Sequence, residues 1–145
     1  MRKNNAISNI SRIRDRANRL IVRELENHCI EGIAPSHGDI MVQLFAGQQY
    51  TMRELADKIN RSKPTVTVLV DKLVDCGYVA REKSDTDSRV SFICLTAKGL
   101  ALKPVFDSIS AKLNDLVYGG LNEDEAEALE KLLARVEQSL AGKLK

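Results

Sequence analysis

Two adjacent helix starts between Thr51 and Gly77 constrain the fold more than any other feature of the sequence. Thr51 and Glu54 have the T-x-x-E spacing of a capping box, in which each side chain accepts a hydrogen bond from the backbone N–H of the other residue. Ser62 is a second N-cap residue, and Pro64 follows in the first turn, where its missing N–H costs no intrahelical hydrogen bond. Two short helices therefore meet across a turn of about three residues, the spacing of a helix-turn-helix.

The stretch after Ser62 can be interpreted as a strand or as a helix. From Thr65 to Val68, polar and apolar β-branched residues alternate, which is typical of a half-buried strand. The helical spacing of apolar residues continues much further and ends at Gly77, a natural residue just after a helix. We therefore predict a helix. Its apolar face holds Val66, Leu69, Val70, Leu73 and Val74, and its outward faces hold Thr65, Thr67, Val68, Asp71 and Lys72.

The residues after Gly77 predict a β-hairpin. The runs YVARE (78–82) and VSFICL (90–95) are rich in β-branched and aromatic residues, and the polar segment KSDTDSR (83–89) separates them. This segment is too long for a tight turn and suits the tip of an extended hairpin. The sequence thus places a charged hairpin directly after the helix-turn-helix.

Amphipathic helices flank this central part. The first is predicted from Ile7 to about Cys29, and the second is predicted to begin with a capping box of Ser36 and Asp39 and to end at Gly47.

Two further helices are predicted after the hairpin. Thr96 caps a long helix with an interior kink at Pro104, Gly119 stops it, and Asn122 caps the last helix, which has an acidic first turn. The first and last helices carry more apolar stripe than one small domain needs. We expect them to pack between two chains, the alternative being the core of a monomer.

Composition excludes several other classes of protein. A chain of 145 residues with 43% hydrophobic content can bury one core, and its net charge of +2 neither supports nor excludes DNA binding. The three cysteines form no CxxC, and no segment has the length of a membrane span, so we expect reduced thiols in the cytoplasm and no membrane partner. Without a GxSxG, HExxH or phosphate-binding glycine motif, we expect no enzyme, no cofactor and no catalytic residue.

In the order of these elements and in its motifs, the chain resembles the MarR family of winged helix-turn-helix regulators. The resemblance covers residues 50–99 and rests on several short motifs. These are ELA at 54–56, PTVT at 64–67, LVDKL at 69–73, GYVxR at 77–81, DxR at 87–89 and LTxxG at 95–99. The flanking helices match the family by pattern and length only.

The resemblance implies a mainly α fold with a small β-hairpin wing, α+β in class. It implies an N-terminal dimerisation helix (1–34), a winged helix-turn-helix domain (35–98) and interlocking C-terminal dimerisation helices (99–145). It also implies a homodimeric repressor, associated with the nucleoid in a bacterial or archaeal cytoplasm. Such a repressor binds a pseudo-palindromic operator in double-stranded DNA and is released by a small phenolic or other organic effector.

A DNA-binding set is assigned by position from the same resemblance. It comprises Arg61, Ser62, Lys63, Pro64, Thr65, Thr67, Val68, Asp71 and Lys72 at the recognition helix, with Arg81, Lys83 and Arg89 in the wing. Val68 departs from the arginine or other polar residue of many relatives, so we expect apolar contact there, for instance with a thymine methyl. Ser84, Asp85 and Ser88 also depart from the family's wing, and we expect weaker minor-groove insertion.

Several alternatives stay open at this point. Arg89 can contact DNA, or it can form an ion pair with Asp87 that shapes the wing. Cys76 and Cys94 fit as inert packing residues, whereas Cys29 can be inert, redox-sensitive or part of a zinc site. The zinc ligands beside it would be His28, Glu24, Glu26 and His37. The run of Arg12, Arg14, Arg16, Arg19 and Arg23 can be a solvated helix face or a patch for DNA or a partner. A winged helix can also bind a protein instead of DNA.

Overall fold

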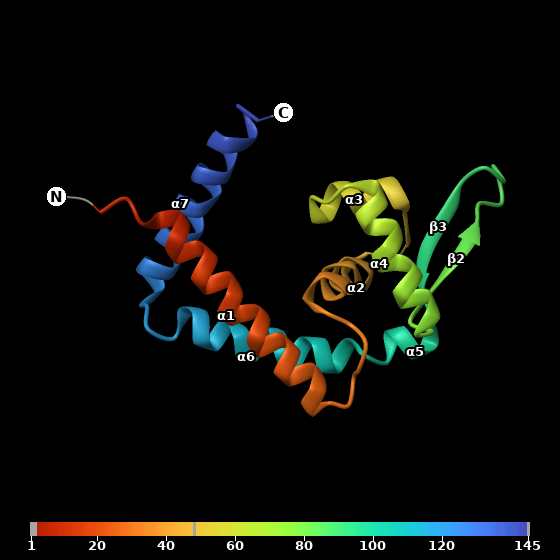
Figure 1. The fold of residues 1–145 in the computed structure, drawn as a ribbon, viewed down its shortest axis with the longest axis horizontal. Helices are drawn as coiled ribbons and strands as arrows, with labels where there is room; N and C mark the ends of the chain where they lie inside the picture. The colour runs from red at the N-terminus through yellow and green to blue at the C-terminus, as the bar shows by residue number, and fades with distance from the viewer. Residues whose placement is uncertain (1–2, 48, 145) are drawn as a thin grey trace. The chain divides into compact units, whose positions relative to one another are not determined.

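The computed structural model describes residues 3–47 and 49–144. These residues form two compact units, and the boundary between them in the sequence lies after Ile109. The first unit contains α1 (Ala6–Asn27), α2 (Pro35–Ala46), β1 (Gln49–Thr51), α3 (Met52–Ile59), α4 (Lys63–Asp75), β2 (Val79–Lys83), β3 (Ser91–Leu95) and α5 (Ala97–Leu100). Helix α6 (Lys103–Tyr118) crosses the boundary, and α7 (Glu123–Ala141) belongs to the second unit. Figure 1 shows the order of these elements along the chain.

The two helix starts lie where the capping pattern predicts them. Thr51 Oγ1 accepts a hydrogen bond from the N–H of Glu54 at 3.1 Å, and Glu54 Oε1 accepts one from the N–H of Thr51 at 3.0 Å. Ser62 Oγ accepts from the N–H of Thr65 at 3.4 Å, with Pro64 in the first turn of α4. The prediction that a helix begins at Ser62 is confirmed.

The predicted hairpin is also confirmed, but its sheet has a third strand. Strands β2 and β3 pair antiparallel, with Val79 opposite Leu95 and Lys83 opposite Ser91. The short strand β1 pairs with the other edge of β3, which gives the order β1-β3-β2. The pattern of residues 49–51 does not predict this strand, because three residues are too few for a period.

A close backbone contact joins the hairpin to α5. Thr96 donates its hydroxyl to the Gly77 carbonyl at 2.5 Å and accepts from the N–H of Gly99 at 3.0 Å. A Cβ at Gly99 would lie 2.0 Å from the carbonyl oxygen of Tyr78, so only glycine fits there. The LTxxG motif therefore holds the base of the hairpin against α5.

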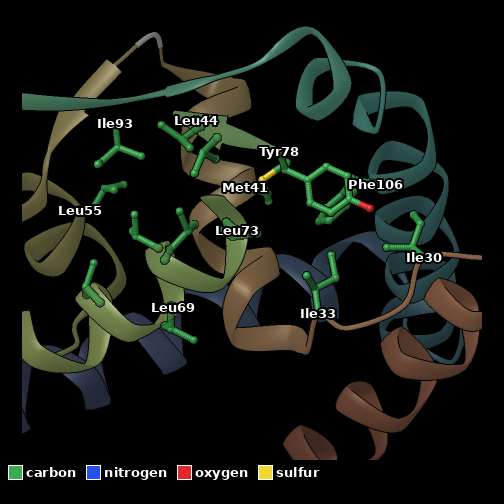
Figure 2. Packing of buried hydrophobic residues seen from close by; sticks show 14 of the residues in the cluster. Ile30, Ile33, Met41, Leu44, Leu55, Leu69, Leu73, Tyr78, Ile93 and Phe106 are labelled. Atoms are coloured by element: carbon green, nitrogen blue, oxygen red, sulfur yellow. The ribbon is translucent and has the colours of Figure 1, made fainter. Parts of the chain in front are cut away.

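The hydrophobic core of the first unit lies where α2, α3, α4 and β3 meet. Figure 2 shows apolar side chains from these elements converging, among them Met41, Leu55, Leu73 and Ile93. Burial of such a side chain contributes roughly 1.5–3 kcal/mol. This core fixes one face of α4 and leaves its other faces exposed.

Two predicted helix boundaries are wrong. Helix α2 begins after Ala34 and not after Ser36, because the Ala34 N–H donates to His37 Nδ1 at 2.8 Å and Pro35 occupies the first turn. The long helix predicted after Thr96 is two helices, since α5 ends at Leu100 and α6 starts at Lys103. Pro104 thus lies in a first helical turn, where it needs no kink.

The second unit consists of the end of α6 and α7. Asn122 caps α7 as predicted, because its Oδ1 accepts from the N–H of Glu125 at 2.9 Å. Tyr118 donates its hydroxyl to Glu130 Oε1 at 2.6 Å and so links the two helices. None of the residues of α7 is buried.

Candidate nucleic-acid interface

Helix α4 presents a continuous exposed face. Its buried face is anchored in the core by Val66, Val70 and Leu73, which are fully buried. At about 1.5 Å per residue, its 13 residues span roughly 20 Å, a length that the major groove of DNA can accommodate. The first turn begins at an exposed cap, so nothing in the first unit covers the N-terminal end of the helix.

Hydroxyl groups line this N-terminal end, and local hydrogen bonds orient them. Ser62 Oγ donates to Thr65 Oγ1 at 2.9 Å, and Thr67 Oγ1 donates to the Lys63 carbonyl at 2.9 Å. Thr67 is half-buried, while Ser62 and Thr65 are exposed. The Thr65 hydroxyl therefore keeps its proton for an external acceptor, and the Thr67 hydroxyl keeps its lone pairs for an external donor.

Val68 lies in the middle of this polar face. Its side chain is 68% exposed, although an apolar side chain is not stabilised by contact with water. An apolar group in this position can contact a thymine methyl but cannot accept or donate a hydrogen bond. The geometry is thus compatible with the predicted apolar contact.

The cations before and within α4 have different surroundings. Arg61 and Lys63 are exposed at the turn and at the first residue of the helix, next to Pro64. Lys72 instead reaches toward the α1–α2 connection, because its Cε lies 3.4 Å from where a Cβ would stand at Gly32. Burial lowers the pKa of His37 in α2, and the Lys72 ammonium lowers it further. Lys72 therefore lies beside the α1–α2 connection, while Arg61 and Lys63 lie at the start of α4.

Two of the predicted wing cations form ion pairs within the chain. Arg81 of β2 contacts Asp71 of α4, and Arg89 Nε contacts Asp87 Oδ1 at 3.1 Å. The Arg89 hydrogen bonds hold the pKa of the Asp87 carboxyl below its ordinary value. Within the described part of the chain, Lys83 has no side-chain partner. The Arg89–Asp87 pair forms, and the Arg89 side chain remains 90% exposed.

Ser84 organises the loop that carries Asp87. Its Oγ accepts from the N–H of Thr86 at 3.2 Å and from that of Asp87 at 3.4 Å. Asp87 in turn accepts from the Arg89 backbone N–H at 3.0 Å. Ser84, one of the residues by which this wing departs from the family's pattern, thus joins the DxR motif in a local hydrogen-bonded turn.

The cysteines show no arrangement for chemistry within the described residues. Cys29 is exposed, with a φ of 60° at the end of α1, and the neighbouring His28 Nδ1 bonds to the Glu24 carbonyl at 2.8 Å. In residues 3–47 and 49–144, no group of three or more His, Cys, Asp or Glu side chains could hold a metal ion. Burial and the nearby Glu82 raise the pKa of the Cys94 thiol, which disfavours a reactive thiolate.

Sequence reasoning missed Lys98, which fixes the end of α4. Its Nζ donates to the Cys76 carbonyl at 2.8 Å and lies 5.0 Å from the centre of the Tyr78 ring. A lysine near the end of a helix can bond its last carbonyls, but this one comes from 22 residues further along the chain. The local sequence therefore does not predict the bond from Lys98 to the end of α4. The pairing of Asp71 with Arg81 was missed for the same reason.

These elements define a winged helix-turn-helix, in which α3 and α4 are the two helices and β2–β3 is the wing. A sequence model of the MarR family matches residues 32–90. The HTH-type transcriptional regulator MhqR of Bacillus subtilis is 29% identical over 123 residues, which cover 83% of this chain and 84% of that protein.

Solved structures of regulators have the same fold. The S. aureus MepR–DNA complex superposes with a TM-score of 0.84 at 25% identity, over 97% of this chain and 100% of the other. A mutant of E. coli MarR complexed with operator DNA has a TM-score of 0.80 at 23% identity, over 94% and 99%. Residues 32–90 thus match the MarR family in sequence, and the chain as a whole has the fold of MarR-family transcriptional regulators.

Proposed function

We propose that two copies of this chain bind a pseudo-palindromic operator in double-stranded DNA and repress transcription. Helix α4 enters the major groove, and the β2–β3 loop reaches the adjacent minor groove. The observation that carries this proposal is the exposed face of α4, which opens at a capped N-terminus and presents hydroxyls around Val68. Relatives of the same fold support it, since MepR and MarR are described in DNA complexes.

Within this proposal, the contacts divide into two kinds. Thr65, Thr67 and Val68 face base edges in the major groove, where sequence is recognised. The exposed cations and the cap hydroxyl, Arg61, Ser62, Lys63, Lys83 and Arg89, position the protein on the phosphates. The remaining members of the set lie beside these contacts: Pro64 in the first turn of α4, Asp71 paired with Arg81, and Lys72 near Gly32.

The dimer is supported by apolar residues that the chain leaves uncovered. Ile7, Ile10 and Ile13 are exposed on α1, and α7 exposes a stripe at helical spacing. That stripe consists of Leu132, Leu133, Val136 and Leu140. Both helices interlock with those of a second copy. In that assembly, residues 1–34 and 99–145 form the dimerisation parts, and residues 35–98 form the DNA-binding domain. A symmetric dimer places two α4 helices about one turn of DNA apart.

Regulation is by a small phenolic or other organic effector, and no catalytic step is involved. The protein acts in the cytoplasm. None of the helices in the described residues combines the length and hydropathy of a membrane span. An effector that binds the folded dimer raises its melting temperature, so a thermal-shift screen followed by an assay of DNA release identifies it.

The experiment that tests DNA recognition is selection from random 30-base-pair duplexes, followed by electrophoretic shifts at several salt concentrations. We expect a selected duplex to be bound in the nanomolar range, about 10⁻⁸ M, with affinity that falls as salt rises. No salt-sensitive binding at micromolar protein would exclude a DNA regulator and would favour a protein-binding winged helix.

Two variants locate the recognition helix. Lys63→Ala should weaken binding to selected and scrambled duplexes alike and lower the salt slope by about 1, because it removes a phosphate contact. Thr67→Ala should weaken binding to the selected duplex by about 1 kcal/mol and scarcely affect the scrambled one. Lys131→Ala in α7, which removes a lysine paired with Glu127, is the control. Unchanged affinity in both test variants would refute this placement.

A further inference from the structure

An ion pair joins α4 to the wing within the candidate interface. Nη2 of Arg81 contacts Oδ1 of Asp71, and the two side chains remain 38% and 55% exposed. Asp71 is on the recognition helix and Arg81 is on the first wing strand, two elements that pack side by side (Figure 1). The pair is therefore within reach of a duplex that contacts both elements.

An aspartate in this position has an electrostatic cost for DNA binding, because its carboxylate repels phosphates. Arg81 neutralises the carboxylate within the same chain. Asp71 also affects Arg81, because an arginine whose N–H donors and charge are directed to a carboxylate is less available to a phosphate. Of the three wing cations, Arg81 and Arg89 are each paired with an aspartate, and Lys83 is not, within the described residues.

We propose that Asp71 withholds Arg81 from the DNA backbone and so limits sequence-independent binding. This inference rests on the proposed function, in which α4 and the wing face DNA. Phosphate contacts add affinity for every sequence, whereas contacts of Thr65, Thr67 and Val68 depend on the base. With Arg81 paired, base contacts carry a larger share of the affinity, and the complex depends less on salt.

The variant that tests this is Asp71→Asn, which removes the charge while keeping the size and an acceptor oxygen. Freeing Arg81 adds about one phosphate contact, so the slope of log affinity against log salt should become steeper by about 0.9. At about 0.1 M salt, this corresponds to roughly eight-fold tighter binding of a scrambled 30-base-pair duplex. The selected duplex should change in the same direction. Asp71→Ala serves if the melting temperature of the asparagine variant falls sharply.

A second aspartate of the same helix supplies the control for net charge. Asp75 is exposed, has no ion-pair partner among the described residues, and ends α4. Asp75→Asn should change affinity by less than about two-fold, because a distant exposed charge is screened by salt. Equal tightening by Asp75→Asn and Asp71→Asn would overturn the proposal, since general repulsion would then explain both.

Double substitution identifies the group that is released. In a chain that also carries Arg81→Gln, Asp71→Asn should give no further tightening. If tightening persists there, or if Asp71→Asn alone leaves affinity unchanged or weaker, Asp71 does not act by withholding Arg81. Suppose that the wild-type chain selects no sequence but Asp71→Asn still tightens binding to the scrambled duplex. This result would refute the proposed function and leave the inference about Asp71 standing. Failure of both proteins to bind any duplex would sink both proposals.

Discussion

The two units of the chain differ in how far their apolar side chains are buried. In the first unit, Leu55 and Leu73 are fully buried in a core that also anchors α4. In the second unit, Leu132 is 55% exposed and Val136 is 48% exposed, although they follow the same helical spacing. An amphipathic pattern therefore identifies a helix but does not say what covers it.

This difference separates two kinds of stability. The first unit holds its recognition helix with a core of its own, so the candidate interface exists within one chain. The second unit buries no residue of α7 and has a stripe that only another surface can cover. Under the proposed dimer, that surface is a second copy, and the stability of α7 then depends on protein concentration.

The largest expected effect is in the core beneath α4. Leu73→Ala should lower the free energy of unfolding by about 3 kcal/mol, because it removes a buried side chain and leaves a cavity. Leu132→Ala is the matched control, with the same change at an exposed position of α7. Urea unfolding at low micromolar protein measures both. Equal destabilisation would erase the distinction between the two units.

A charge on the stripe of α7 should break the dimer. Val136→Glu places a carboxylate in the proposed interface twice per dimer, and we expect dimerisation to weaken by about 2 kcal/mol or more, roughly 30-fold. Ala134→Glu adds the same charge about 160° around the helix and should have little effect. Sedimentation over a range of concentrations gives the comparison. A dimer that is equally stable in both variants would assign the interface to another surface.

The helix caps offer a smaller comparison between the units. Thr51→Ala and Asn122→Ala each remove a reciprocal capping box and should each cost about 1 kcal/mol of helix stability. Hydrogen exchange should show the loss from Thr51→Ala throughout the first unit, because α3 packs in its core. The loss from Asn122→Ala should remain within α7. Loss of protection across both units from Asn122→Ala would show that they unfold as one.

The smallest effect concerns the pH dependence of the first cap. Hydrogen bonds from the Thr51 backbone and side chain lower the pKa of Glu54 below its ordinary 4.5. Because the folded pKa is the lower one, this stabilisation is present above about pH 4.5 and is lost as pH falls through the folded value. Wild type should melt about 1–2 °C above Glu54→Gln at pH 6, with a smaller gap at pH 3.

Asp57→Asn, an exposed change on the same helix, controls for the loss of one charge. A gap between wild type and Glu54→Gln that stays constant from pH 6 to pH 3 would show that the Glu54 charge does not stabilise the cap.

Local patterns predicted most of the first unit. The starts of α3 and α4 depend on hydrogen bonds between residues three positions apart, α4 ends shortly before Gly77, and the β2–β3 hairpin joins two strands that follow each other in the chain. Gly77 has a φ of 82°, in the left-handed region that glycine adopts without strain. The misplaced start of α2 shows where local patterns fail. His37 can bond back to Ala34 and Asp39 can bond back to Ser36, so the sequence offers two starts for this helix.

The sequence by itself determined which residues form the recognition helix and which side chains line its exposed face, since a cap, a proline in the first turn and an apolar stripe act over one or two turns. Only the tertiary structure decided where those side chains find partners. It paired Asp71 with Arg81, turned Lys72 toward Gly32, and added β1 to a strand more than 40 positions away. These contacts join residues on different elements, and their geometry is fixed by the packing of the core between them.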